Sequence, residues 1–158
     1  TVRRQRQMCI RDSNEALRLA QIAYPNNPIV LEYCGLNQPV YVIGDSDRLI
    51  QCLKNLVGNA VKYSELRSEI TLEINAQDDS ILFTVKDHGQ GIPADQQERI
   101  FERFQRADGV TLRRGDSSSG LGLSIVKMLM EGMGGTVRVQ SEIGVGSRFI
   151  LTLQRSLS

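Results

Sequence analysis

Alternation between apolar and polar residues over residues 69–89 constrains the fold of this chain most strongly. The segment reads EITLEINAQDDSILFTVKDHG, with a period of two on both sides of the polar turn QDDS. A period of two is typical of strands with one buried face, and a short turn between two such runs predicts a β-hairpin. The chain must therefore build a sheet with a face that another layer covers.

A helix is predicted directly before this hairpin. Asp45 or Ser46 can cap its start, because either side chain can accept hydrogen bonds from free amides of the first turn. Its apolar residues follow the period of 3.6; they are Leu49, Ile50, Leu53, Leu56, Val57, Ala60 and Val61.

The other segments complete a mixed pattern of elements. We expect helices in NEALRLAQIA (14–23), ADQQERIFERF (94–104) and GLGLSIVKMLMEGMG (120–134), and strands in IVLEY (29–33), PVYVIG (39–44) and twice within residues 135–153. Residues 105–119, without periodicity, predict a surface loop. Hairpin-paired strands with helices that do not alternate one for one favour an α+β fold. We expect a two-layer α/β sandwich, in which helices pack on one face of a mixed, mostly antiparallel sheet.

Composition excludes several classes of function. The chain has 158 residues, enough for one domain, and a net charge of +1. So small a charge argues against a broad electrostatic grip on nucleic acid, and no tryptophan is present to build a base-stacking surface. Cys9, Cys34 and Cys52 lack metal-ligand spacing, which favours reduced thiols in the cytoplasm.

Residues 3–13, RRQRQMCIRDS, have an unusual origin in this interpretation. The string matches, residue for residue, one reading frame of a transposase-adapter oligonucleotide used to prepare sequencing libraries. The alternative is a natural basic leader. We treat residues 1–13 as an adapter-derived scar outside the fold, residues 14–155 as one domain and residues 156–158 as a tail.

Polar residues on the predicted helix suggest a ligand-binding face. Asn55 and Asn59 are four residues apart and share one face of the helix, with Lys62 and Tyr63 one turn further on. Burying an asparagine amide without a partner is costly, so this face is expected at the border of the core, where a ligand could bind.

A carboxylate ends the second strand of the hairpin. Asp87 continues the parity of Ile81, Phe83 and Val85, which directs it toward the core. Either it accepts hydrogen bonds from the amides of its own turn, or it serves as an acceptor for a ligand. Gly89 and Gly91 follow, where missing side chains let a flat group approach the backbone.

A third segment, SSSGLGLSIVK (117–127), places glycines before and within the first turn of a helix. Backbone amides exposed at such a helix start can bind phosphate oxygens. A flexible hinge is the alternative.

Taken together, these segments resemble the catalytic, ATP-binding domain of sensor histidine kinases, in the gyrase–Hsp90–kinase–MutL superfamily. The resemblance covers residues 14–154. Residues 47–64 resemble the asparagine box, DHGQGIP (87–93) the first glycine box, IFERFQRAD (100–108) the phenylalanine box and SSGLGLSIVK (118–127) the second glycine box. Residues 134–153 are similar to the closing strands of the family.

The resemblance implies a role for each matching residue. Asn59 would bind Mg²⁺, with Asn55 supporting the phosphates and the metal, Lys62 neutralising phosphate charge and Tyr63 lining the nucleotide. Asp87 would accept the adenine amine. Arg106 would approach the γ-phosphate, and Asn55 and Arg106 are the catalytic candidates. The remaining candidates line adenine (Gly89, Gly91, Ile92, and more weakly Ser147) or close the lid over the phosphates (Gly120, Leu121, Gly122, Leu123).

Two departures from the family pattern bear on the activity. Ser118 stands where the second glycine box usually begins with glycine, and Asn55 occupies the position of a glutamate that activates the nucleophile in the ATP-hydrolysing branch. Asparagine cannot act as a general base, which favours a histidine kinase. A nucleotide-sensing module without phosphotransfer and a related ATPase are the alternatives. His88, beside adenine, is read as an ordinary loop residue and not as the phosphoacceptor.

The resemblance also implies cofactors and partners. The expected cofactors are ATP and Mg²⁺. The expected partners are a histidine-containing dimerisation domain of the parent protein, absent from this chain, and the receiver domain of a response regulator. We expect an isolated domain that is monomeric and cytoplasmic, whether or not the parent protein is membrane-anchored, with a lid at residues 107–119.

Overall fold

The computed structural model describes residues 6–9, 11–34, 41–65, 67–102 and 122–155. Five strands form a mixed sheet in the order β2-β4-β5-β7-β6: β2 (Ile29–Cys34), β4 (Ile70–Ala76), β5 (Ser80–Lys86), β7 (Gly146–Gln154) and β6 (Thr136–Glu142). In this sheet β2 and β4 run parallel, and the other neighbours are antiparallel. The predicted α+β class is confirmed.

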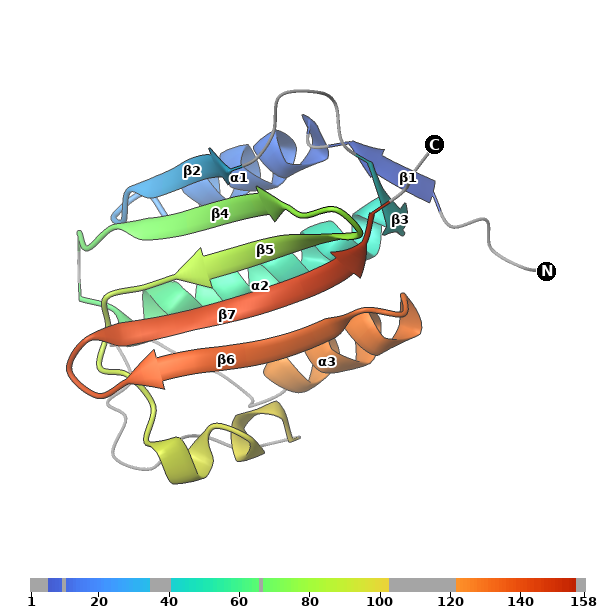
Figure 1. Ribbon diagram of the computed structural model, residues 1–158. Helices are drawn as coiled ribbons and strands as arrows, with labels where there is room; N and C mark the ends of the chain where they lie inside the picture. The colour runs from blue at the N-terminus through green and yellow to red at the C-terminus, as the bar shows by residue number, and fades with distance from the viewer. Residues whose placement is uncertain (1–5, 10, 35–40, 66, 103–121, 156–158) are drawn as a thin grey trace.

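Three α-helices of the described ranges lie on one face of this sheet: α1 (Arg11–Ala23), α2 (Ser46–Tyr63) and α3 (Gly122–Gly132), as Figure 1 shows. Leu53, Leu56 and Val126 from the helices pack in one cluster with Phe83 and Leu151 from the inner face of the sheet. Burying such side chains stabilises the fold by about 1.5–3 kcal/mol each. The two-layer sandwich is thus the arrangement that removes both apolar surfaces from water.

The start of α2 settles which of the two possible residues caps it. Asp45 is the N-cap, and its Oδ1 accepts hydrogen bonds from the amides of Asp47 (3.0 Å) and Arg48 (3.3 Å). Each bond satisfies an amide that has no partner within the helix. The predicted apolar stripe faces the core, with Leu49, Leu53 and Leu56 almost fully buried.

Two predictions about elements differ from the structure. Residues 94–104 were expected to form one helix, but the described part forms two 3₁₀ turns, η1 (Ala94–Gln96) and η2 (Arg99–Phe101). A single sheet was expected, but β1 (Arg6–Cys9) pairs with β3 (Tyr41–Gly44) in a second, two-stranded sheet.

The pairing of β1 bears on the N-terminal segment that we excluded from the fold. Arg6–Cys9 forms an antiparallel ladder with β3, and α1 begins at Arg11. Part of residues 1–13 therefore adopts secondary structure against the domain, whereas their adapter origin stays a prediction. The loop at residues 107–119 lies outside the described residues.

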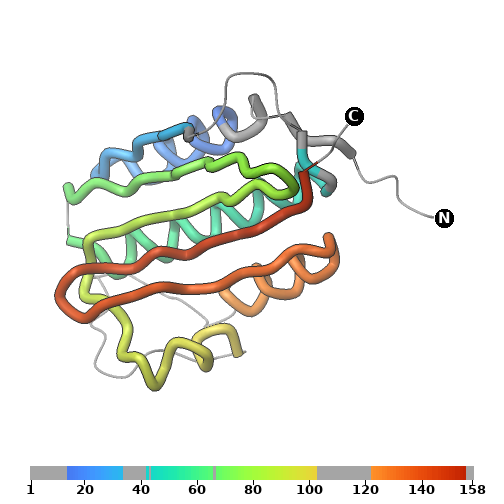
Figure 2. The backbone as a smooth tube through the Cα atoms, in the orientation of Figure 1, coloured from blue at the N-terminus to red at the C-terminus, as the bar shows by residue number. Residues whose placement is uncertain are grey.

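One end of the sandwich gathers the segments that the sequence singled out. The end of β5, the turn between β6 and β7 and the C-terminal end of α2 lie at the same end of the molecule, as the tube in Figure 2 shows. None of the helices in the described ranges is long and apolar enough to cross a membrane.

Candidate functional site

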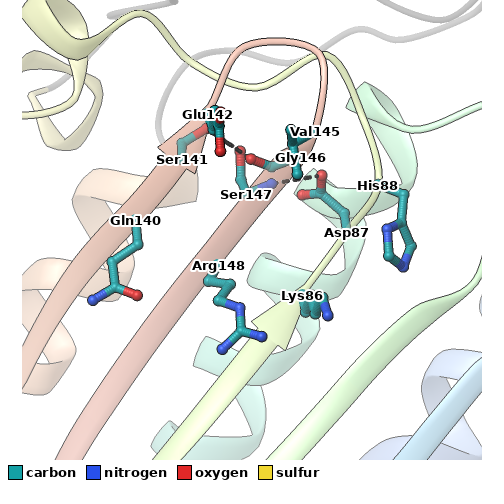
Figure 3. A pocket seen from close by; sticks show the side chains of 10 residues that line it. All are labelled: Lys86, Asp87, His88, Gln140, Ser141, Glu142, Val145, Gly146, Ser147 and Arg148. Atoms are coloured by element: carbon teal, nitrogen blue, oxygen red, sulfur yellow. Dashed lines mark hydrogen bonds between the residues drawn. The ribbon is translucent and has the colours of Figure 1, made fainter.

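Asp87 directly follows β5, and only one of its two carboxylate oxygens accepts hydrogen bonds from the described residues. The residue is 5% exposed. Its Oδ1 accepts hydrogen bonds from the amides of Gly89 (2.9 Å) and Ser147 (3.2 Å), and its own amide donates to the Ser147 carbonyl (2.9 Å). Figure 3 shows the carboxylate turned toward β7. Oδ2 accepts no hydrogen bond from the described residues. The interpretation of Asp87 as an acceptor for amides of its own turn is confirmed for Oδ1, whereas its role as an acceptor for a ligand stays a prediction.

Burial raises the pKa of the Asp87 carboxyl above its ordinary value of 3.8, because the charged form loses hydration. The hydrogen bonds from Gly89 and Ser147 and the neighbouring His88 oppose this rise in pKa without cancelling it. A carboxylate in this setting gains from any further donor at Oδ2.

The glycines after Asp87 are required by the protein itself. A Cβ on Gly89 would overlap the carbonyl oxygen of Tyr63, and a Cβ on Gly91 would overlap that of Glu142. Gly91 also has a φ of +80°. The sequence interpretation assigned this space to a flat ligand; the structure fills it with backbone from α2 and from the end of β6 instead.

These close contacts bring the adenine-wall candidates together. Gly89 packs closely against the end of α2, and Gly91 packs closely against the end of β6. Ile92 is half-buried against the core, and Ser147 on β7 is 6% exposed. Asp87, Gly89 and Ser147 are linked directly by hydrogen bonds. The structure therefore brings these positions together, although Asp87 and Ser147 are 60 positions apart in the sequence. Their contact with adenine stays a prediction.

The polar face of α2 ends beside Gly89, close to Asp87. Asn55 and Asn59 are half-buried, and their side chains make no hydrogen bond to the described residues. Lys62 and Tyr63, also half-buried, form the last turn of α2, whose Tyr63 carbonyl adjoins Gly89. Two amides at the edge of the core with unused oxygens suit a hard cation that keeps water and phosphate oxygens as its other ligands.

No cluster of three or more carboxylate, histidine or cysteine side chains exists among the described residues to hold a metal alone. A cation that brings phosphate oxygens and water as its other ligands does not depend on such a cluster. The residues present fit Mg²⁺ in that form.

A hollow of about 350 Å³ lies beside Asp87 (Figure 3). It includes Asp87 and Ser147, but Lys86, Gln140 and Arg148 line it from the sheet face opposite to α2, since they alternate with the core residues of their strands. None of the α2 candidates lines it. The hollow and the α2 face are therefore separate features that share the Asp87 end of the sheet.

Some of the remaining candidates lie within the described residues and others lie outside them. Gly122 is the first residue of α3, and Leu123 packs against the core. Arg106, Gly120 and Leu121 lie outside the described residues. His88 is exposed, as expected for an ordinary loop residue.

Two polar residues at this site were missed by the sequence analysis. The hydroxyl of Ser141 accepts a hydrogen bond from the amide of Ile92 (2.7 Å), and Gln97 donates to the carbonyls of Ile92 and Ser141. A signal existed for Ser141, because it shares the inward parity of Val137 and Val139 on β6 and is nevertheless polar. No local pattern marks Gln97.

Cys52 is the free thiol whose surroundings the structure describes. It is fully buried between α2 and α3, and burial raises its pKa to about 12. A thiol with so high a pKa is a poor nucleophile, so Cys52 serves packing.

Comparison with known proteins places this geometry in a family. The family described as "Histidine kinase-, DNA gyrase B-, and HSP90-like ATPase" matches residues 44–157. The circadian input-output histidine kinase CikA of Synechococcus elongatus is 40% identical over 115 residues, which are 72% of this chain and 15% of that protein. The sensor protein SrrB of Staphylococcus aureus is 37% identical over 127 residues, 80% of this chain and 21% of that protein.

Solved structures show the same fold. The full-length ShkA structure in complex with AMPPNP has a TM-score of 0.77 at 30% identity and covers 100% of this chain and 33% of that one. The mycobacterial sensor histidine kinase MprB has a TM-score of 0.79 at 24% identity, covering 96% of this chain and 97% of that one, and supports the fold alone. The chain spans about a fifth or less of the two curated relatives. Both its sequence and its fold show that the chain belongs to the histidine kinase-, DNA gyrase B- and HSP90-like ATPase family, as a catalytic domain of the sensor histidine kinase type.

Proposed function

We propose that this domain binds ATP with Mg²⁺ and donates the γ-phosphoryl group to a histidine on a dimerisation domain of its parent protein. The receiver domain of a response regulator would be the next acceptor, and the cytoplasm the compartment. Family membership supports the nucleotide, and the structure of ShkA in complex with AMPPNP supports it for that relative. The isolated domain is expected to be a monomer.

The free oxygen of Asp87 is the observation that carries the proposal. A buried carboxylate with Oδ1 occupied by backbone amides and Oδ2 without a donor among the described residues is matched by the exocyclic amine of adenine. Guanine carries a carbonyl oxygen at that position of the ring, which the carboxylate would repel. Asp87 would therefore select the base as well as hold it.

The phosphates and the metal would lie along α2. Asn59 would hold Mg²⁺ through its amide oxygen, Asn55 would support the metal and phosphates, and Lys62 would neutralise phosphate charge, with Tyr63 lining the nucleotide. Bound Mg²⁺ would neutralise charge on the transferring phosphoryl group. From outside the described residues, Arg106 would approach the γ-phosphate and Gly120 and Leu121 would complete the lid ahead of Gly122 and Leu123.

Asn55 decides between phosphotransfer and hydrolysis in this proposal. An amide has no basic lone pair to remove a proton from water, so the site would hold ATP without activating a nucleophile of its own. The acceptor histidine must then supply the nucleophile. Appreciable ATP hydrolysis by the domain alone would favour the ATPase alternative.

Calorimetric titration with ADP and Mg²⁺ tests the base assignment. We expect the wild-type chain to bind, and Asp87→Asn to bind about 10- to 100-fold more weakly, because a donor replaces the acceptor that faces the amine. Asp78→Asn, the same change in the exposed turn between β4 and β5, is the matched control and should bind like the wild type. Equal affinity of Asp87→Asn and wild type would overturn the assignment.

Metal removal tests the α2 assignment. We expect chelation of Mg²⁺ to weaken ADP binding by the wild type, and Asn59→Ala to lose most of this metal dependence, because its amide oxygen is the expected ligand. Asn75→Ala, on an exposed position of β4, should keep it. Metal-independent binding by the wild type would contradict the role of Asn59.

Phosphotransfer itself requires an acceptor histidine. The domain should be mixed with its cognate histidine-containing helical hairpin, ATP and Mg²⁺, and assayed for acid-labile phosphohistidine. Phosphohistidine supports the kinase, whereas ADP binding without transfer to the cognate hairpin would favour a nucleotide-sensing module.

A further inference from the structure

Ser141, near the end of β6, joins three segments through one hydroxyl. Its Oγ accepts a hydrogen bond from the amide of Ile92 (2.7 Å), donates to the carbonyl of Gly146 (3.1 Å) and lies 2.7 Å from the Oγ of Ser147. Ile92 belongs to the segment after β5, and Gly146 and Ser147 begin β7. The hydroxyl therefore connects the loop of Asp87 to both strands of the β6–β7 hairpin.

Only one placement of the protons makes all three contacts hydrogen bonds. A hydroxyl has one proton and two lone pairs. The Ile92 amide uses one lone pair of Ser141, and the Gly146 carbonyl must receive the only proton of Ser141. Ser147 must then donate its proton to Ser141, which leaves the Oγ of Ser147 with lone pairs alone. Beside the Asp87 carboxylate, Ser147 is thus held as an acceptor.

Gln97 fixes the same segment from the other side. Its Nε2 donates to the carbonyl of Ile92 (3.0 Å) and to the carbonyl of Ser141 (3.1 Å). Both protons of the amide are used, and both backbone groups of Ile92 are held, the amide by Ser141 and the carbonyl by Gln97. Ile92 is one of the residues that the family resemblance places against adenine.

We propose that Ser141 and Gln97 are positioning residues for the nucleotide base. Together they hold Ile92 against the β6–β7 hairpin, and Ser141 orients the hydroxyl of Ser147 as an acceptor. The apolar contact from Ile92 and the acceptor from Ser147 are therefore in place before the nucleotide binds. This inference rests on the proposed function, because it takes the ligand to be an adenine nucleotide. A preformed site avoids the cost of ordering these groups on binding.

The test uses paired variants of the whole chain. Ser141→Ala removes the hydroxyl from three partners, and we expect ADP affinity to fall roughly 5- to 50-fold. Ser141→Thr keeps a hydroxyl in a strand position that tolerates β-branched residues, and should restore at least part of the affinity. Ser80→Ala, at the opposite end of β5, is the matched control and should bind ADP like the wild type.

A readout without nucleotide tests directly whether Ser141 holds Ile92. In the free protein, the amide of Ile92 should exchange with solvent at least about tenfold faster in Ser141→Ala than in the wild type or in Ser80→Ala, as measured by NMR, because its acceptor is gone. Gln97→Met keeps the length of the side chain without its donors, and should also weaken ADP binding. The double variant should lose less affinity than the sum of the two, because both act through Ile92.

The outcomes separate this inference from the function on which it rests. If the wild-type chain does not bind ADP, the proposed function fails. If the wild type binds ADP and both Ser141→Ala and Gln97→Met bind it equally well, the positioning role fails. Unchanged exchange of the Ile92 amide in Ser141→Ala also overturns it. Should Ser141→Ala fail to fold, Gln97→Met decides, since Gln97 lies between two short turns and not in a strand.

Discussion

At the scale of single residues, the two oxygens of Asp87 differ: Oδ1 has a structural role, and Oδ2 has the binding role that we propose. Oδ1 accepts hydrogen bonds from the amides of Gly89 and Ser147 and thereby ties the loop after β5 to β7. Oδ2 receives no such bond from the described residues. Loss of hydration makes the charged form costly, and a ligand donor at Oδ2 would recover part of that cost.

The raised pKa of Asp87 predicts opposite effects of pH on stability and on binding. The folded pKa lies above 3.8, so folding takes up a proton between that value and the folded pKa. The resulting stability is fully present below pH 3.8 and is lost as the pH rises through the folded pKa. ADP binding should instead strengthen over the same rise, because the ionised carboxylate is the better acceptor.

Denaturant unfolding and ADP titrations at a series of pH values check this prediction. Asp87→Asn is the control for both, because it cannot ionise; protons gained by ADP itself affect the wild type and the variant alike. If the wild type and Asp87→Asn show the same pH dependence of ADP affinity, Asp87 is not the group that controls it.

At the scale of elements, glycines decide how closely the hairpin and the loop approach. Gly91 adjoins the carbonyl of Glu142 at the end of β6, and the amide of Gly144 in the turn donates to the carbonyl of Gln90 (2.9 Å). Gly146 in turn leaves no room for a Cβ beside the carbonyl of Asp87. The first glycine box and the β6–β7 hairpin therefore pack closely together at one corner of the proposed site.

Gly91→Ala and Gly134→Ala form a matched pair that separates the cost of a positive φ from the cost of steric overlap with neighbouring backbone. Both glycines have positive φ, +80° and +73°, but only Gly91 has backbone where a Cβ would lie. Gly134→Ala should reduce the free energy of unfolding by about 1 kcal/mol through its left-handed backbone alone. Gly91→Ala should cost about 2 kcal/mol more, because the chain must also move apart.

Urea unfolding of both variants measures this difference, and ADP titration shows whether the corner matters for binding. Gly91→Ala should also weaken ADP binding, whereas Gly134→Ala should not. Similar losses of stability in the two variants would contradict the close approach at Gly91.

The segment 94–104 shows where element prediction was wrong. Its spacing favours a helix, but η1 and η2 are separate 3₁₀ turns, closed by bonds such as Gln96 to Pro93 and Glu102 to Arg99. Between the two turns, the side chain of Gln97 donates hydrogen bonds to Ile92 and Ser141. Ile100, within η2, is buried in the core. These tertiary anchors outweigh the weak preference of a short segment for one continuous helix.

At the scale of the whole molecule, the fold divides into a five-stranded sandwich and a small second sheet. The described part of the proposed binding site is built from α2, the loop after β5 and the β6–β7 hairpin. The second sheet, β1 with β3, joins the larger sheet through the bridge between Val42 and Arg155, beyond the end of β7 that is remote from Ser147. The N-terminal strand therefore lies away from the residues that surround Asp87.

Removing residues 1–10 tests this division, because it deletes β1 and leaves α1 complete. We expect ADP affinity to stay within about twofold of that of the full chain, because β1 pairs with β3 at the end of the molecule remote from Ser147. The free energy of unfolding should fall modestly, since the β1–β3 ladder is lost while Val42 stays buried against the domain. A loss of binding beyond about tenfold would show that the segment supports the site.

What the sequence determined by itself was the set of elements and the residues on their faces. Alternation revealed the β4–β5 hairpin and the inward direction of Asp87, and the period of 3.6 revealed the buried stripe of α2 and the shared face of Asn55 and Asn59. These features depend on neighbours within one element, so a local pattern is sufficient to predict them.

The tertiary structure alone decided what those faces meet. Ser141 and Ile92 are joined across 49 positions of sequence, and Gly89 adjoins Tyr63 because a loop and a helix end converge. Such contacts follow from strand register and from the packing of α2 on the sheet, which no local period encodes. The identity of a buried acceptor could therefore be predicted, whereas the hydroxyl and amide that hold its surroundings had to be observed.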